Sequence, residues 1–153
     1  MPRFEPRDPD FEAKVRDSFG RQTAMQTLGA VMGRVEPGEM EIEMPYRADL
    51  AQQHGFIHGG IVTSILDSAC GYAAFSLSAP DSAVLTVEYK VNFVAPAKGE
   101  RLVARGEVVR PGATVTVCKG NVLAYQGGEE KLVATMLATF ILMPNRPDLA
   151  DCL

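Results

Sequence analysis

Residues 52–67 read QQHGFIHGGIVTSILD, and this stretch decides how the chain folds. Two glycines, Gly59 and Gly60, follow a histidine and open an apolar run that continues to about residue 77. The run predicts one long and largely buried helix, with the single carboxylate of Asp67 about two turns from its start. Because burying an unpaired carboxylate costs free energy or shifts its pKa, an acid in this position suggests a functional site.

The residues on both sides of this helix alternate with the period of two that is typical of strands. Before it, residues 28–35 and 39–44 flank the turn residues Glu36-Pro37-Gly38 and predict a hairpin. After it, we expect four long strands separated by proline and glycine turns, at 85–93, 101–110, 113–125 and 131–143.

A short helix is predicted near the beginning of the chain. Apolar residues recur at positions 11, 15 and 19, and the helix should end near Gly20. Asp8 is the expected N-cap, with Pro9 at the first helical position.

The order of elements predicts an α+β fold in a single domain. An antiparallel sheet of about six strands would wrap around the long central helix and bury it. We divide the chain into an N-terminal extension with a short helix (1–24), the sheet-and-helix domain (25–143) and a polar C-terminal tail (144–153).

Composition narrows the class of protein. The chain has 153 residues, 46% of them hydrophobic, which suits one globular domain. Its net charge of −4 argues against a nucleic-acid partner. No secretory leader is apparent, and the longest apolar stretch, 132–143, is too short to span a bilayer. The three cysteines are not closely paired in the sequence, which suggests a reducing compartment. We therefore expect a cytoplasmic protein without a membrane partner.

Gly59 and Asp67 are the two strongest candidates for chemistry. At a helix start, free backbone N–H groups can hold an oxyanion; alternatively, the glycines form a tight turn that needs positive φ. Asp67 lies eight residues further on, roughly 12 Å along a helix, so the two cannot reach one carbonyl within one chain. If both act together, two antiparallel subunits must share the site. The alternative is a structural aspartate bonded to Ser64 or Ser68.

Other polar residues are weaker candidates. Thr86 could position a water molecule, although threonine is also an ordinary strand residue. Gln52 could donate an amide hydrogen bond or simply be solvated. His54 and His58 are four residues apart with a glycine between them, so a zinc site is not expected.

The pattern of these residues resembles the PaaI-type hotdog thioesterases. The resemblance is carried by Gln52, the sequence His58-Gly59-Gly60, an acid nine positions after that histidine, Thr86, and the segment NFVAPAKGE at 92–100. It covers about residues 25–143, including the order of the elements, and implies the hotdog fold.

The resemblance also implies an activity and residue roles. It implies hydrolysis of acyl-CoA thioesters by a homodimer, or a dimer of dimers, without metal or cofactor. Gly59 would donate its N–H to the thioester oxygen with help from Gln52, and Asp67 of the partner subunit would be nucleophile or general base. Thr86 would orient water, and His58 would brace the loop. Acyl-binding candidates are Gly60, Ile61, Ile65, Tyr72 and Phe93.

Two other functions remain open from the sequence. A hotdog hydratase or dehydratase would use a histidine and an acid for proton transfer. A non-catalytic acyl-CoA-binding module would need no acid at position 67.

Overall fold

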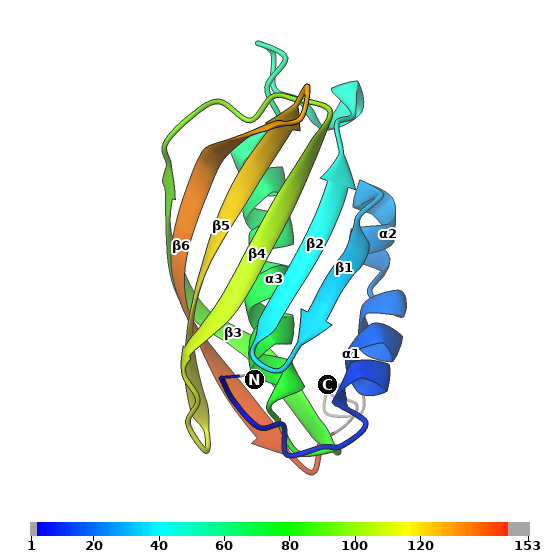
Figure 1. Cartoon of the computed structure of the whole chain (residues 1–153), viewed down its shortest axis with the longest axis vertical. Helices are drawn as coiled ribbons and strands as arrows, with labels where there is room; N and C mark the ends of the chain where they lie inside the picture. Colours follow the sequence, from blue (N-terminus) through cyan, green and yellow to red (C-terminus); the bar gives the residue numbers. More distant parts are fainter. Residues whose placement is uncertain (1–2, 147–153) are drawn as a thin grey trace.

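The computed structural model describes residues 3–146, and within them a six-stranded antiparallel sheet curves around one long helix, α3 (Figure 1). The order of strands across the sheet is β1-β2-β4-β5-β6-β3. This is the α+β hotdog architecture expected from the sequence. The helices are α1 (Phe11–Gly20), α2 (Thr23–Leu28) and α3 (Gly59–Ser76), and the strands are β1 (Val31–Glu36), β2 (Glu39–Pro45), β3 (Ser82–Phe93), β4 (Arg101–Arg110), β5 (Val115–Gln126) and β6 (Glu129–Pro144).

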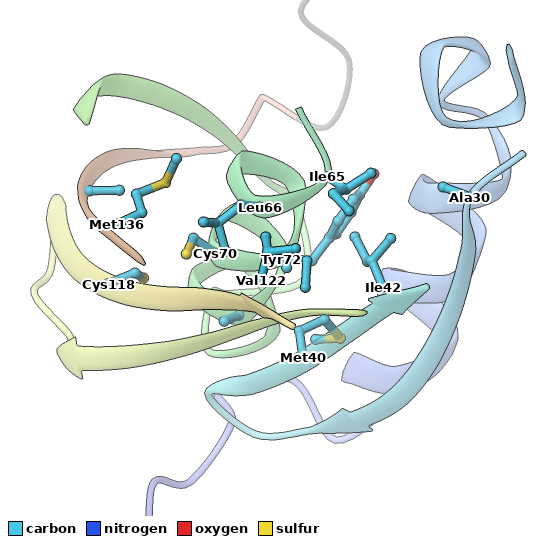
Figure 2. Close-up of a cluster of buried hydrophobic side chains, with 14 of the residues drawn as sticks. Ala30, Met40, Ile42, Ile65, Leu66, Cys70, Tyr72, Cys118, Val122 and Met136 are labelled. Carbon is cyan, nitrogen blue, oxygen red and sulfur yellow. The ribbon is translucent and has the colours of Figure 1, made fainter. Parts of the chain in front are cut away.

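Two glycines in the sheet determine how closely α3 packs on it. Gly106 of β4 and Gly120 of β5 are register partners beneath the middle of the helix. A Cβ atom on Gly106 would lie 2.5 Å from the Ala69 carbonyl carbon, and one on Gly120 would lie 2.7 Å from Leu66 Cδ1. At Gly106 the strand and helix backbones therefore approach to a distance that no side chain would allow, and at Gly120 the strand leaves room for the Leu66 and Cys70 side chains. Figure 2 shows the buried side chains around this contact.

The N-terminal helices pack against the sheet and α3 as part of the folded body. Val15 of α1 is completely buried, and α1 runs beside β1 (Figure 1). Lys14 Nζ donates to the Ser78 and Ala79 carbonyl oxygens at 3.0 and 3.2 Å, just after the end of α3, and pairs with Asp8 at 3.4 Å. These contacts satisfy carbonyl groups of the segment that follows α3, and they fix α1 to it.

The predicted start of α1 is wrong by two residues, and α2 was not predicted. Asp10 is the N-cap, because the Asp8 carboxylate instead accepts the N–H of Asp10 and pairs with Lys14. Helix α2 is only six residues long and ends at Gly29, whose φ of 68° is the left-handed C-cap conformation. It crosses the boundary that we drew between residues 24 and 25, and most of the tail 144–153 lies outside the described residues.

Strand β3 forms one edge of the sheet and leaves large apolar side chains exposed. These include Leu85, Val87, Tyr89 and Phe93. The register with β6 shifts between Thr86 and Glu88, so Val87 is an extra residue in the strand. A bulge of this kind bends the strand and turns the neighbouring side chains, here Thr86, in a new direction.

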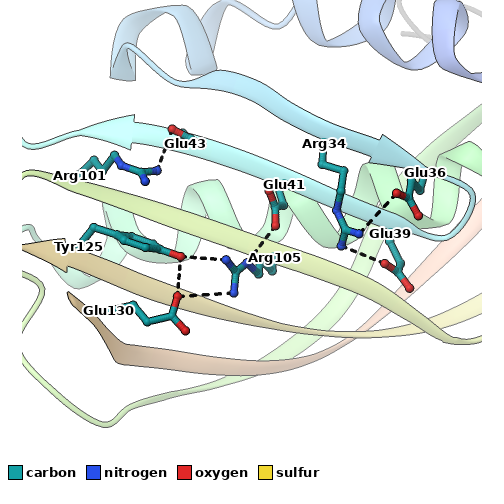
Figure 3. Close-up of polar contacts among 9 residues, drawn as sticks. All are labelled: Arg34, Glu36, Glu39, Glu41, Glu43, Arg101, Arg105, Tyr125 and Glu130. Atoms are coloured by element: carbon teal, nitrogen blue, oxygen red, sulfur yellow. Dashed lines mark hydrogen bonds and ion pairs between the residues drawn. The ribbon is translucent and has the colours of Figure 1, made fainter. Parts of the chain in front are cut away.

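The outer face of the sheet, the side away from α3, is charged instead. Arg105 of β4 donates to Glu41 at 2.9 Å and to the Tyr125 hydroxyl at 2.8 Å, and that hydroxyl donates to Glu130 at 2.6 Å (Figure 3). Arg34 pairs with Glu36 and Glu39 of its own β1–β2 hairpin, and Arg101 of β4 pairs with Glu43 of β2. Among the helices described, none is long and apolar enough to cross a membrane.

Candidate active site

The start of α3 leaves one backbone N–H free to bind a ligand. His58 is the N-cap, and its Nδ1 accepts the N–H of Gly60 at 2.9 Å. Its carbonyl oxygen accepts the N–H groups of Ile61 and Val62 at 2.9 and 3.1 Å. Of the first four N–H groups of the helix, only that of Gly59 therefore lacks an acceptor in residues 3–146. The free donor lies at the positive end of the helix dipole.

The alternative reading of these glycines, a turn that needs positive φ, is wrong. Neither Gly59 nor Gly60 has a positive φ; the residue that does is Gly55, at 83°, in the preceding loop. Since His58 already caps the helix with both its side chain and its carbonyl oxygen, the two glycines are ordinary first residues of α3. Because they have no side chains, the two glycines leave room for a ligand at the start of α3.

A cleft opens at this helix start, and we call it the Gly59 cleft. Phe93 closes one side of it, because a Cβ atom on Gly59 would lie only 3.2 Å from Phe93 Cζ. The Gln52 side-chain oxygen accepts the N–H of His54, and its amide nitrogen has no acceptor in the part of the chain described. The cleft is lined by Gln52, Phe56, Ile57, Gly59, Val62, Phe93, Val94, Ala95, Pro96, Ala97 and Val133.

A second cleft surrounds the carboxylate, and we call it the Asp67 cleft. Thr86 Oγ1 donates to Asp67 Oδ1 at 2.9 Å, so the bulge in β3 turns this hydroxyl toward α3. Burial raises the pKa of Asp67, and the Thr86 hydrogen bond partly opposes that rise. The expected alternative, a bond from Asp67 to Ser64 or Ser68, does not occur among residues 3–146, and Ser64 instead donates to the Gly60 carbonyl at 2.8 Å. The cleft is lined by Ser18, Arg21, Gln22, Asp67, Ser68, Gly71, Tyr72, Phe75, Ser82, Ala83, Val84, Thr86 and Phe140.

The structure sorts the residues singled out from the sequence into two groups. Asp67, Thr86 and Tyr72 line one cleft, whereas Gly59, Gln52 and Phe93 line the other. His58 and Gly60 form the cap of α3 beside the Gly59 cleft. Ile61 is half-buried against the core, and Ile65 is completely buried and lines neither cleft, so in the single chain it is a core residue.

The two clefts have no lining residue in common. One holds a free backbone N–H at a helix start, and the other holds a carboxylate with a hydroxyl partner. Within residues 3–146, no three histidine, cysteine, aspartate or glutamate side chains group together as metal ligands.

Sequence reasoning missed four polar residues of the Asp67 cleft. Ser82 begins β3, and the other three, Ser18, Arg21 and Gln22, belong to the N-terminal segment. Ser18 Oγ lies 3.2 Å from the Tyr72 hydroxyl, and the Phe19 ring meets the Tyr72 ring edge-on at 5.8 Å. The helical spacing of positions 11, 15 and 19 predicted an inward face at Phe19, but nothing in the sequence indicates which part of α3 that face contacts.

Comparison with known proteins agrees with this fold. A family model described as "Thioesterase superfamily" matches residues 54–131, which include Gly59, Asp67 and Thr86. A protein of Halobacterium salinarum with the provisional name of esterase is 37% identical over 119 residues, covering 74% of this chain and 78% of its own.

Solved structures show the same similarity. A thioesterase family protein from Silicibacter pomeroyi is 55% identical, with a TM-score of 0.86 over 88% of this chain and 98% of its own. The E. coli PaaI protein, from the phenylacetic acid degradation operon, shares the fold with a TM-score of 0.78 at 20% identity, over 86% of this chain and 92% of its own. The matched family model, the curated relative and the curved sheet around α3 lead to one conclusion: this chain is a hotdog-fold member of the thioesterase superfamily.

Proposed function

We propose that the protein hydrolyses acyl-CoA thioesters to the free acid and CoA, at sites shared between the two subunits of a homodimer. The observation that carries this proposal is the separation of the two clefts in one chain. Gly59 and Asp67 lie on the same helix about 12 Å apart, which is too far for both to touch one carbonyl group. A second copy with α3 antiparallel would bring the Gly59 cleft of one subunit to the Asp67 cleft of the other.

Strand β3 supports this arrangement, because it is the apolar edge on which a second copy could pair. Its row of exposed side chains would be covered by an antiparallel copy of the same strand. If the two-fold axis passes between Tyr89 and Lys90, Thr86 of one subunit lies opposite Phe93 of the other. Thr86 binds Asp67, and Phe93 contacts Gly59, so this register joins the two clefts.

The chemistry follows from the groups in each cleft. The Gly59 N–H and the Gln52 amide would donate to the thioester oxygen and stabilise the negative charge that develops on it. Asp67 of the other subunit would take a proton from water, or attack the carbonyl carbon directly, and the raised pKa makes its carboxylate a stronger base. In both routes the C–S bond breaks and CoA leaves as a thiolate. With Asp67 as the base, water supplies the new oxygen of the free acid. After direct attack, water attacks the Asp67 carbonyl carbon of the acyl–Asp67 anhydride, so the acid leaves with an Asp67 oxygen and Asp67 keeps the oxygen from water.

Complementation between two inactive variants tests the shared site. Asp67→Ala removes the acid but keeps the Gly59 N–H, whereas Gly59→Pro removes that N–H but keeps the acid. Purified separately, both should release almost no CoA from any acyl-CoA. After unfolding and refolding together in equal amounts, half of the dimers are mixed and each contains one intact site, so about a quarter of the wild-type activity should return.

Other results would contradict the proposal. If mixing restores nothing although mixed dimers form, each subunit contains its own complete site. Hydration of an enoyl-CoA without thiol release would identify a hydratase. Tight binding of acyl-CoAs by the wild-type protein, with no CoA released across short, medium, long and aromatic acyl groups, would identify a binding module. A single turnover in H₂¹⁸O separates the two routes, because only direct attack places the label in Asp67.

A further inference from the structure

We infer that Tyr46 is a positioning residue for the Gly59 cleft: its hydroxyl group holds the loop of residues 52–56 so that the Gln52 amide can donate to the thioester oxygen. This inference rests on the proposed function, in which Gln52 helps to stabilise the charge that develops on that oxygen. Tyr46 follows strand β2 directly and lines neither cleft, so it would act through the loop and not on the substrate.

The first observation is that backbone hydrogen bonds fix the two ends of this loop. Ala51 and Ile57 pair as an isolated β-bridge. The Ile57 N–H also donates to the Ala97 carbonyl at 2.8 Å, and the His58 N–H donates to the Leu50 carbonyl at 3.0 Å. These bonds determine where the loop leaves and rejoins the body of the protein, but none of them reaches the residues in between.

The second observation is a single hydrogen bond that joins the loop itself to the rest of the chain. Tyr46 Oη donates to the Gly55 carbonyl at 2.8 Å. Within the loop, the Gly55 N–H donates to the Gln52 carbonyl at 3.0 Å and closes the turn that begins at Gln52. Among residues 3–146, no other hydrogen bond connects residues 52–56 to the chain outside them, so the position of this turn depends on the Tyr46 hydroxyl.

The third observation is that Tyr46 is anchored to the sheet. Its N–H donates to the Glu100 carbonyl at 3.0 Å, and the preceding residue, Pro45, is the register partner of Arg101 in β4. The Tyr46 ring is half-buried and packs against the hydrophobic core. The hydroxyl therefore offers the loop a donor that is fixed in advance, which reduces the ordering that substrate binding requires.

The fourth observation concerns the direction of the Gln52 amide. The His54 N–H donates to it, and since a backbone N–H can only donate, the amide atom that accepts is the oxygen. The amide nitrogen is left to donate to a ligand in the Gly59 cleft, which Gln52 lines. Because hydrogen bonds weaken steeply as their geometry is lost, a shift of the loop would weaken this donor.

Tyr46→Phe tests the inference, because it removes only the hydroxyl group. With hexanoyl-CoA or benzoyl-CoA, whichever the wild-type protein hydrolyses faster, kcat should fall about three- to tenfold, the usual effect of losing one neutral hydrogen bond. KM should change less than about twofold, because the Gln52 donor matters most when the oxygen becomes charged in the transition state. Tyr125→Phe is the matched control: it removes a hydroxyl group with two hydrogen bonds on the outer face of the sheet, so kcat should not change.

Double variants show whether Tyr46 acts through Gln52. Gln52→Ala alone should lower kcat about a hundredfold, and adding Tyr46→Phe should lower it no further, since the donor that the loop positions is gone. In the Gly59→Pro background the Gln52 donor remains, so Tyr46→Phe should still lower kcat about three- to tenfold. All rates are measured well below the melting temperature of each variant, so that loss of folded protein does not contribute.

The outcomes separate this inference from the proposed function. If Tyr46→Phe keeps the wild-type kcat, or lowers kcat by the same factor with and without Gln52, the inference is wrong and the proposed function stands. If its effect persists in Gln52→Ala but vanishes in Gly59→Pro, the loop acts through the start of α3, which also overturns the inference. If no acyl-CoA releases CoA, the proposed function fails and this inference fails with it.

Discussion

The outer face of the sheet and the β3 edge are both exposed in the single chain, yet their side chains differ in kind. On the outer face, the charges of Arg34, Arg101 and Arg105 meet glutamates at hydrogen-bond distances (Figure 3). On the β3 edge, large apolar side chains are exposed, and within residues 3–146 the nearby Asp67 carboxylate has only a hydroxyl group as its hydrogen-bond partner. Paired charges suit permanent contact with water, whereas unpaired apolar groups suit a subunit interface.

The largest expected effect comes from placing a charge on the β3 edge. Val87 is 58% exposed in β3, and Val31 is 57% exposed in β1, the opposite edge of the sheet. Val87→Glu would bury an unpaired carboxylate in the proposed interface, at about 3–5 kcal/mol, which weakens association by between about 10²-fold and several thousandfold. Light scattering after size exclusion should show monomers, and CoA release should fall in parallel.

Val31→Glu is the matched control, because it changes the same residue type at the same exposure on the other edge. It should remain a dimer with full activity. If Val31→Glu is monomeric while Val87→Glu remains a dimer, the interface lies on the β1 edge and not on the β3 edge.

The next effect separates the Gly59 N–H from the shape of the cleft. His58 has φ −57° and ψ 136°, an extended conformation that suits a residue before proline, and Gly59 is the first residue of α3, where proline fits well. Gly59→Pro should fold normally yet lose about 10²- to 10³-fold in kcat, the usual effect of removing one oxyanion donor.

Gly59→Ala keeps the N–H and introduces the same contact with Phe93, whose ring is the flexible end of a side chain. We expect it to lose less than about tenfold in kcat. Equal losses in the two variants would mean that crowding against Phe93, rather than the missing donor, limits the rate.

A smaller effect concerns the free energy of unfolding. Replacing a carboxylate by an amide should raise it at Asp67 and lower it on the outer face of the sheet. Burial raises the folded-state pKa of Asp67, so its ionised form destabilises the fold above that pKa, and the penalty disappears as pH falls through it. Asp67→Asn should therefore raise the free energy of unfolding at pH 7 by roughly 0.5–1 kcal/mol, with a gain that shrinks on acidification. Glu41→Gln, on the outer face, should lower it instead, because Glu41 pairs with Arg105.

Urea unfolding at a fixed subunit concentration, repeated between pH 4 and 8, measures both changes. If Asp67→Asn instead lowers the free energy of unfolding at pH 7, the ionised carboxylate stabilises the fold. Its burial would then not be destabilising.

The smallest effect should come from the centre of the charged network. Arg105→Met removes contacts to Glu41, Tyr125 and Glu130, but these groups are partly exposed, so the loss should be only about 0.5 kcal/mol at low salt and less in 1 M NaCl. Dimer mass and CoA release should stay unchanged. A loss of dimers would place a second interface on this face.

The sequence predicted the sheet and the central helix well, because alternation and turn residues are local signals. Strand β4 has the predicted limits, and α3 ends within one residue of them. The bulge at Val87 was not predicted, since it depends on pairing with β6. Helix α2 was missed because its six residues are too few to show a period.

The candidate site was predicted only in part, because some of its contacts depend on tertiary packing and not on local sequence signals. The spacing from Gly59 to Asp67 indicates a divided site, but the Thr86–Asp67 bond depends on how β3 lies beside α3. Gln22 and Ser18 could not be found, because only tertiary packing brings the start of the chain to Tyr72.

The glycine pair beneath α3 has a consequence for how the protein can change. One helix carries both Gly59 and Asp67, and Gly106 and Gly120 set its distance from the sheet. A side chain at position 106 would push against the α3 backbone at Ala69 and Cys70, and one at position 120 would push against the Leu66 and Cys70 side chains. If the helix shifted in a two-fold dimer, each proposed site would lose alignment from both subunits at once, so these two positions admit almost no variation.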